Sequence, residues 1–373
     1  MKIAYVISSL KIGGAEIALA QIAPRIKEKG HEVFVAFFHD GPIRARLEAA
    51  GITTFCITGL LNRYDMVAWW RLSCWLKRNR IELLHTSLWS GNIIGRLLGR
   101  WHNIPVVSDL HGNCQTEGAL RNWGDRLTAH LSSVTIAVSN SVAVAYKKYI
   151  LKKRFINIVT IPNGIETANI VNAPVTAPLH RSAFNIPTDA FVVGAVGRLE
   201  PIKGYELLIE ACALLPINTY LLIVGDGSCR TELEQLAVKT GLANRCIITG
   251  FRNDAFRFYQ LFDCFAIASH SEGLSLALLE AMAAACPIVT TNQYTTHDVL
   301  THDWTGLITT QRVPSEYAKL LQIFARNPSL RHRMGTAAQR HVIQHHELSS
   351  VIEHLDSLYR PLKIQLEKNR SVD

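Results

Sequence analysis

The sequence predicts an α/β protein of two doubly wound, Rossmann-like domains that face a central cleft. Apolar, strand-like runs alternate with helix-like segments in two successive series, each roughly 170 residues long. A proline-containing, apolar-poor stretch at 172–179 reads as a linker between them. We therefore expect one domain over residues 1–172 and a second over 173–344, within a chain of 373 residues.

The first series starts at once, without the layout of a signal peptide. Its expected strands are Ile3–Ile7, Glu32–Phe38, Ile81–His85, Pro105–Ser108 and Thr135–Val138. Gly13 and Gly14 occupy the first strand-to-helix turn, where glycine lets the backbone approach a ligand, although a plain turn explains them equally well. The Gly-x-Gly-x-x-Gly order is missing, which disfavours NAD.

His111 follows the expected strand at 105–108. The carboxyl ends of parallel strands are where open α/β sheets bind ligands, so this imidazole is placed for chemistry. A lone histidine is nevertheless more often structural.

The second series carries two cations at one strand-to-helix turn. Its expected strands are Phe191–Gly197, Tyr220–Val224, Cys246–Thr249, Phe262–Ala268 and Ile288–Thr291. Arg198 and Lys203 follow the first of them beside Gly204. Arginine and lysine both bind phosphate oxygens, so this turn predicts an anion site.

Two carboxylates stand in the stretch 271–280, which leads from a strand into an apolar helix. Glu272 is expected in the loop before the helix, and Glu280 inside it, where burial requires a hydrogen-bond partner. The amides of Gly273, Leu274 and Ser275 are expected at the helix N-terminus, ready for an anion. The pattern suits a sugar phosphate or a nucleotide. Alternatively, Glu272 only favours the helix dipole and Glu280 pairs with a core arginine.

Composition narrows the partners. The net charge is +9, and residues 1–170 hold 21 Lys and Arg against 11 Asp and Glu. Such a basic half attracts anionic lipid or a phosphorylated carrier, whereas no nucleic-acid module is recognisable. Eight scattered cysteines without a Cys-x-x-Cys pair indicate neither zinc nor disulfides, which favours the cytosol.

Two segments suggest a contact with a membrane surface. Residues 62–80 combine three tryptophans with basic residues, as in an interfacial helix, although a core helix with a solvated basic end is the simpler alternative. Residues 147–154 form a second basic cluster.

Taken together, these motifs resemble retaining glycosyltransferases of family 4, which have the GT-B architecture. The resemblance is carried by Gly197–Gly204, Val224–Gly227, Gly250–Phe251 and the Glu272–Glu280 spacing before Pro287, with support from Gly13–Glu16 and Pro162–Glu166, and it spans about residues 1–310. It implies a nucleotide diphosphate sugar as donor and no metal or other cofactor. It also implies that a segment near 345–366 crosses back onto the N-terminal domain.

The resemblance assigns roles to residues. Glu272 would hold hydroxyls of the donor sugar, Glu280 the ribose, Arg198 and Lys203 the diphosphate, and His111 would lie near the transferred sugar. The donor-binding set that it implies is Gly13, Gly14, Gly250, Phe251, Gly273, Leu274, Ser275, Leu276 and Glu280. A helix N-terminus and two cations would then stabilise the departing diphosphate. Retention through front-face attack is likewise what the resemblance implies.

The sequence departs from the family pattern at three sites. Leu274 and Ser275 stand where Phe and Gly are usual, Ala285 stands where Gly is usual, and residues 294–298 lack a Gly-Gly-x-x-Glu element.

Three functions stay open on this basis. The first is sugar transfer to a glycan or lipid-linked acceptor in bacterial surface polysaccharide or lipopolysaccharide assembly, at the cytoplasmic face of the inner membrane. The second is a nucleotide-sugar epimerase of the same architecture. The third is a non-catalytic nucleotide-sugar-binding protein. The donor base, the sugar and the acceptor are not specified by the sequence.

Overall fold

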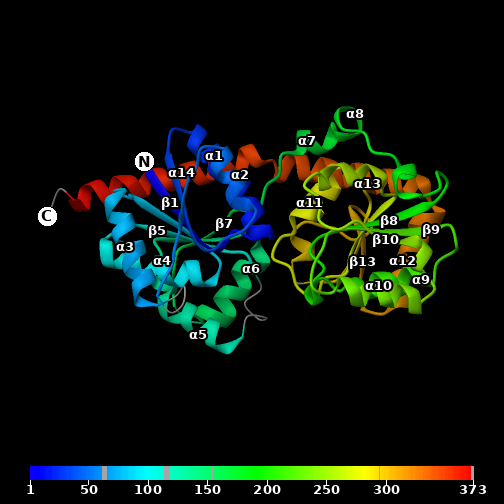
Figure 1. Ribbon diagram of the computed structural model, residues 1–373, viewed down its shortest axis with the longest axis horizontal. Coiled ribbons are helices and arrows are strands. Elements are labelled where there is room, and N and C mark those ends of the chain that lie inside the picture. Colours follow the sequence, from blue (N-terminus) through cyan, green and yellow to red (C-terminus); the bar gives the residue numbers. More distant parts are fainter. Residues whose placement is uncertain (61–64, 113–117, 153, 294, 371–373) are drawn as a thin grey trace. The chain divides into compact units, whose positions relative to one another are not determined.

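The computed structural model describes residues 1–60, 65–112, 118–152, 154–293 and 295–370. The chain divides into two compact units (Figure 1). Unit 1 comprises Met1–Gly164 and Leu348–Asp373, and unit 2 comprises Ile165–Glu347. The domain boundaries predicted from the sequence lie after residues 172 and 344. The assignment of the donor to the second domain and of the acceptor to the first stays a prediction.

Unit 1 is built on a parallel sheet of seven strands in the order β3-β2-β1-β4-β5-β6-β7. The strands are β1 (Lys2–Ser9), β2 (Glu32–His39), β3 (Thr53–Cys56), β4 (Leu83–Ser87), β5 (Val106–Leu110), β6 (Val134–Ala137) and β7 (Ile158–Thr160). The order reverses between β1 and β4, so the carboxyl ends of these two strands flank the crevice where such sheets bind ligands.

Helices connect the strands of unit 1. They are α1 (Gly14–Glu28), α2 (Ile43–Ala49), α3 (Met66–Arg78), α4 (Trp89–His102), α5 (Ala119–Thr128), α6 (Asn140–Ala145) and the π-helical turn η3 (Tyr146–Leu151). The last helix of the chain, α14 (Leu348–Arg370), packs beside α1 and closes the same core (Figure 1). Among the described residues, no helix is long and apolar enough to cross a membrane.

Unit 2 repeats the plan with six parallel strands in the order β10-β9-β8-β11-β12-β13. The strands are β8 (Phe191–Val196), β9 (Thr219–Val224), β10 (Cys246–Ile248), β11 (Cys264–Ile267), β12 (Ile288–Thr291) and β13 (Gly306–Thr309). The helices are α7 (Thr167–Val171), α8 (Ala173–Thr176), α9 (Tyr205–Ala213), α10 (Arg230–Lys239), α11 (Leu276–Ala283), α12 (Pro314–Arg326) and α13 (Pro328–His345). Here the order reverses between β8 and β11.

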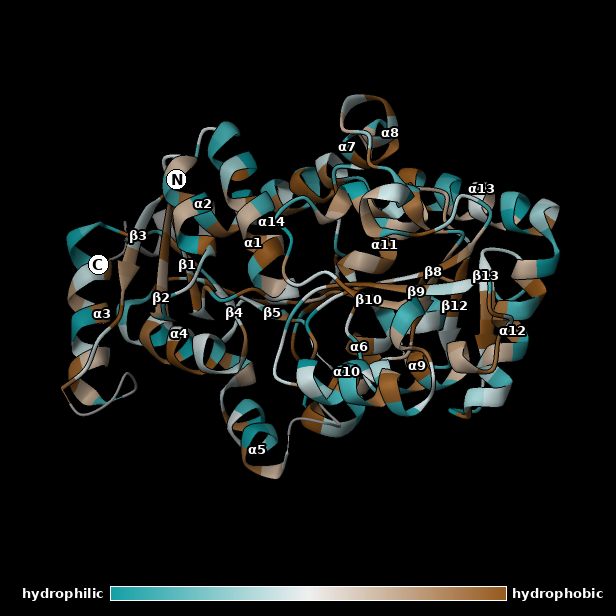
Figure 2. Cartoon of the chain, turned by 45° about the vertical axis from the view of Figure 1, so that its right-hand side comes forward, coloured by the Kyte–Doolittle hydropathy of each residue, from teal (hydrophilic) through white to brown (hydrophobic). Residues whose placement is uncertain are grey.

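Both sheets are buried by helices on their two faces, which is why their strands are apolar without alternation. β2 is brown over most of its length in Figure 2, whereas the helices carry both colours. Five consecutive residues of β1, Ile3–Ile7, are buried. The predicted fold class, two doubly wound Rossmann-like units, is confirmed.

Three local expectations need correction. The helix that was expected to have the amides of Gly273–Ser275 at its N-terminus begins later. Its N-cap is Ser275, whose carbonyl oxygen accepts the first helical hydrogen bond, from Leu279 N. The stretch 172–179, expected as a linker, contains α8. The helix expected over 62–80 runs from Met66 to Arg78, and residues 61–64 lie outside the described part of the chain.

Ala285, the residue after the C-cap of α11, adopts φ 54°. This left-handed conformation costs a residue with a Cβ about 1–2 kcal/mol, and glycine usually occupies it after a helix. We therefore expect Ala285→Gly to raise the free energy of unfolding by about 0.5–1 kcal/mol, since the added freedom of the unfolded chain offsets part of the relief. Urea unfolding measures it.

The adjacent residue supplies the control for this prediction. Ala284 has φ −77°, a conformation that alanine adopts without strain. Ala284→Gly should therefore destabilise the protein. Equal effects of the two substitutions would contradict the conformational argument.

Candidate functional site

Lys203 and Glu272 meet at the reversal of strand order in unit 2. Lys203 ends the 3₁₀ turn η5 (Pro201–Lys203) that follows β8, and Glu272 lies in the loop after the neighbouring strand β11. Lys203 Nζ lies 2.5 Å from Glu272 Oε1, and Ser269 Oγ donates to the same oxygen at 2.7 Å. The predicted cation and carboxylate are therefore one hydrogen-bonded cluster.

A glycine makes this approach possible. Gly204, the residue after Lys203, has φ 64°, and a Cβ there would stand 2.3 Å from the carbonyl oxygen of Ala268. The backbone of the β8–α9 turn can therefore lie against the end of β11 only without a side chain at this position.

Arg198 lies on the same turn but is exposed. Its guanidinium makes no ion pair with a residue that the structure describes, in contrast to Lys203. A planar guanidinium at the carboxyl edge of a parallel sheet is available to an anionic ligand.

Glu280 has a partner that the sequence did not identify. Tyr259, in η7 (Ala255–Leu261), donates its hydroxyl hydrogen to Glu280 Oε2 at 2.7 Å. Burial raises the pKa of Glu280, and the Tyr259 hydrogen bond lowers it by a smaller amount. The expectation of a hydrogen-bond partner is met by a tyrosine, not by a core arginine. No local sequence signal marks this pair.

The remaining donor residues are spread over both units. In unit 2, Gly250 has φ 75° and its backbone bridges to Gly225, while the ring of Phe251 is 48% exposed. In unit 1, Gly13 is the N-cap of α1, and Glu16 folds back so that a Cβ on Gly13 would lie 2.4 Å from its Oε2. Of the predicted residues, Lys203, Glu272 and Ser275 line one small pocket.

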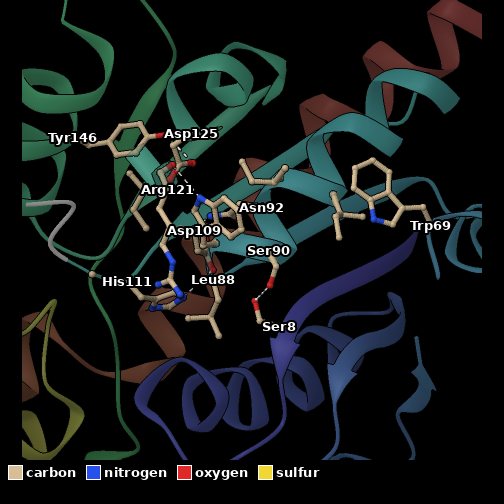
Figure 3. A pocket seen from close by; sticks show the side chains of 15 residues that line it. Ser8, Trp69, Leu88, Ser90, Asn92, Asp109, His111, Arg121, Asp125 and Tyr146 are labelled. Atoms are coloured by element: carbon tan, nitrogen blue, oxygen red, sulfur yellow. Dashed lines mark hydrogen bonds and ion pairs between the residues drawn. The ribbon is translucent and has the colours of Figure 1, made fainter. Parts of the chain in front are cut away.

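His111 lines a pocket of about 560 Å³ in unit 1 (Figure 3). Its Nε2 lies 3.5 Å from Asp109 Oδ2, and Asp109 Oδ1 lies 2.8 Å from His85 Nε2. Burial raises the pKa of Asp109, but the imidazoles of His85 and His111 lower it further, so that the net pKa is below its usual value. The carboxylate therefore stays ionised between two imidazoles.

The same pocket contains side chains suited to a sugar. The indoles of Trp69 and Trp89 line it together with Arg121, Asp125 and Tyr146. Aromatic faces with a few charged groups are typical of polar-ligand sites. Sequence reasoning missed Trp89, Arg121 and Asp125, because they come from α4 and α5 and share no motif. Within the described part of the chain, no three His, Cys, Asp or Glu residues form a group that could hold a metal ion.

Comparison with known proteins assigns both halves of the chain. A family model described as Glycosyltransferase Family 4 matches residues 12–169, and one described as Glycosyl transferases group 1 matches residues 177–341.

Curated relatives are distant. The lipopolysaccharide core biosynthesis glycosyltransferase LpsD of Rhizobium meliloti is 34% identical over 168 residues, which cover 45% of this chain and 49% of that protein. The chain thus spans about half the length of this relative. A UDP-Gal:alpha-D-GlcNAc-diphosphoundecaprenol alpha-1,3-galactosyltransferase of Escherichia coli is 24% identical over 78% of this chain and 79% of its own.

Solved structures share the fold. Anabaena HepE in complex with UDP superposes with a TM-score of 0.85 and 22% identity. The match covers 97% of this chain and 100% of the HepE chain. WaaG, a glycosyltransferase involved in lipopolysaccharide biosynthesis, superposes with a TM-score of 0.75 and 18% identity, over 95% of this chain and 99% of its own. With two parallel Rossmann-like sheets in the GT-B fold and a family match in each half, this chain belongs to the family 4, group 1 glycosyltransferases, which use nucleotide-sugar donors.

Proposed function

We propose that this protein transfers a hexose or related sugar, with retention, from a nucleotide diphosphate sugar to a glycan or lipid-linked acceptor of the bacterial cell surface. The observation that carries the proposal is the cluster of Lys203, Glu272 and Ser269 at the strand reversal of unit 2. It joins a phosphate-binding cation to a hydroxyl-binding carboxylate at the place where the fold binds ligands.

The cluster has two chemical tasks in this proposal. As the bond from sugar to diphosphate opens, negative charge grows on the leaving oxygen, and the ammonium of Lys203 with the exposed guanidinium of Arg198 stabilises it. These fixed cations are the basis for proposing a reaction without a metal ion. Glu272 Oε1 already accepts two hydrogen bonds, whereas Oε2 has none from a described residue, so Oε2 is open to a sugar hydroxyl.

Relatives guide the choice of donor. HepE has been crystallised with UDP-glucose, and the name of the Escherichia coli relative contains UDP-Gal and a diphosphoundecaprenol acceptor. We propose a UDP-sugar as the first donor to test and a membrane-borne diphosphate lipid as the acceptor class.

The deciding experiment incubates the protein with radiolabelled UDP- and GDP-sugars, with and without bacterial lipid extract. Label that moves to the lipid or glycan fraction supports transfer. Isomerised free donor would instead indicate an epimerase, and binding without turnover a non-catalytic protein. Lys203→Gln should lower the transfer rate about 100-fold, as expected for the loss of one preorganised charge at the leaving group.

A second prediction concerns the ribose. Glu280→Gln keeps an acceptor for Tyr259 but replaces one carboxyl oxygen, which could accept from a ribose hydroxyl, by an amide nitrogen, so the Kd for UDP should rise about tenfold. Isothermal titration measures it. Glu234→Gln, at an exposed carboxylate of the same unit that pairs with Arg230, is the control. An unchanged Kd in Glu280→Gln would contradict the ribose role.

We propose that the membrane contact is made by α5 and η3 and not by α3. On α3, Trp75 stacks on Phe55 and Trp69 lines the pocket, which leaves Trp70 exposed. The helix is thus largely the core helix of the alternative interpretation.

Exposed apolar and basic side chains gather instead on α5, η3 and the residues after η3. The apolar ones are Leu120, Trp123, Leu127, Tyr149 and Phe155, and the basic ones are Arg126, Lys147, Lys148, Lys152 and Arg154. The two elements are joined, because Tyr146 donates its hydroxyl hydrogen to Asp125 at 3.3 Å. Aromatic and basic groups together fit an anionic lipid surface. Lys153, part of the predicted basic cluster, is outside the described residues.

Replacing Lys147, Lys148 and Lys152 by Gln should weaken binding to anionic vesicles at low salt. Each lysine near such a surface contributes about 1 kcal/mol. Vesicle pelleting at two salt concentrations measures the change, because exposed charges act less at high salt. Lys77→Gln with Arg78→Gln on α3 is the matched control. A larger loss in the control would return the contact to α3.

A further inference from the structure

A chain of buried polar groups ends at His111. Tyr5 OH lies 3.1 Å from Tyr359 OH, and Tyr359 OH lies 2.5 Å from His85 Nδ1. On its other side, His85 Nε2 lies 2.8 Å from Asp109 Oδ1, and Asp109 Oδ2 lies 3.5 Å from His111 Nε2. The groups come from β1, β4, β5 and α14, all within unit 1.

The ionised carboxylate of Asp109 determines which group donates in each contact of this series. An ionised carboxylate only accepts, so both imidazole nitrogens that face Asp109 carry hydrogen. The approach of His85 Nε2 to Asp109 Oδ1 is short but poorly aligned for a regular hydrogen bond, so the N–H dipole faces the carboxylate without a regular hydrogen bond. With its hydrogen on Nε2, a neutral His85 offers Nδ1 as an acceptor to Tyr359.

The tyrosines fit that direction. Burial raises the pKa of Tyr359 well above its usual value, with the neighbouring Tyr5 adding to the shift, and burial likewise raises the pKa of Tyr5. Both hydroxyls therefore keep their hydrogens. Tyr359 donates to His85, which leaves its oxygen to accept from Tyr5. Each contact in the series then has a defined donor and a defined acceptor.

We infer that Asp109 is a positioning residue for sugar transfer, which holds His111 as the Nε2–H tautomer and so presents Nδ1 as an acceptor toward a sugar hydroxyl in the pocket. The inference rests on the proposed function for the identity of the ligand. The 3.5 Å separation is long for a hydrogen bond, as catalytic contacts often are before the ligand binds.

His85 and Tyr359 support Asp109 from behind. His85 is 2% exposed and Tyr359 is 0% exposed, so neither reaches a ligand directly. Tyr359 lies on α14, which is also held by a hydrogen bond between His31 Nε2 and Asp356 Oδ1 at 2.8 Å. The docking of the last helix thus determines the hydrogen-bond direction at His85, and through Asp109 the state of His111.

The first test reads the tautomers directly. In ¹⁵N-histidine-labelled full-length protein at neutral pH, two-bond ¹H–¹⁵N correlations should show His111 and His85 as Nε2–H tautomers, each assigned by its loss in a single His→Gln variant. His111 as the Nδ1–H tautomer would overturn the inference. This measurement needs no turnover, so it stands whether or not a donor and acceptor are found.

The second test measures transfer. Asp109→Asn should lower kcat about tenfold or more while the KM for the donor stays within about twofold, because a neutral amide holds the imidazole less firmly and most of the proposed donor-binding residues lie in unit 2. An amide cannot accept from both imidazoles, so His85 or His111 should change tautomer. Wild-type kcat with both tautomers kept would contradict the inference.

Tyr359→Phe tests the end of the series that is farthest from His111, and it is less disruptive to folding than Asp109→Asn. It keeps the buried ring but removes the hydrogen bond to His85, and it should lower kcat about threefold to tenfold. Ser73→Ala is the control, since it removes a hydroxyl bound to another histidine of unit 1, His102, at 2.8 Å. If both variants lose kcat equally, a general loss of stability explains the effect. If the wild-type protein transfers no sugar, the proposed function is wrong. The inference about Asp109 is then still tested by the tautomer measurement.

Discussion

The pair of Lys203 and Glu272 depends on one topological fact, the reversal of strand order between β8 and β11. At that reversal, two neighbouring strands send their connections to opposite faces of the sheet, and the crevice between them is free of covering backbone. Lys203 arrives from β8 and Glu272 from β11. A lysine paired in this way keeps its charge fixed at one place, so binding a diphosphate requires little reorganisation. The glycine at 204 is what lets the two connections touch.

Much of this arrangement is predictable from the sequence because its causes are local. Apolar runs bounded by glycine and polar turns predict the strands, and a cation or carboxylate just after such a run falls at the carboxyl edge of a parallel sheet. β3, β7 and β13 escaped prediction because each is only three or four residues long. The start of α11 was displaced by about two residues, since an apolar loop such as Gly273–Ser275 does not differ in pattern from the first turn of a helix.

The partners of the site residues were not predictable, because each comes from a distant part of the chain. Tyr259 reaches Glu280 from 21 residues away, and Tyr359 reaches His85 across 274. No periodicity links such positions, and only the packed fold brings them together. The same holds for α3. Its tryptophans and basic residues suit a membrane surface in sequence, but Trp75 stacks on Phe55 and packs, partly buried, against the core, and Trp69 lines the pocket.

The two units use opposite means to hold a functional group in place. In unit 2, opposite charges meet directly, and the ligand must compete with or join that pair. In unit 1, the charge of Asp109 lies between His85 and His111 at the pocket, and the role we infer for it is to fix where the imidazole of His111 carries its hydrogen. Such an arrangement is only as firm as the groups that hold Asp109. Since one of them is anchored to α14, the last helix belongs to the construction of the pocket as much as the strands that line it.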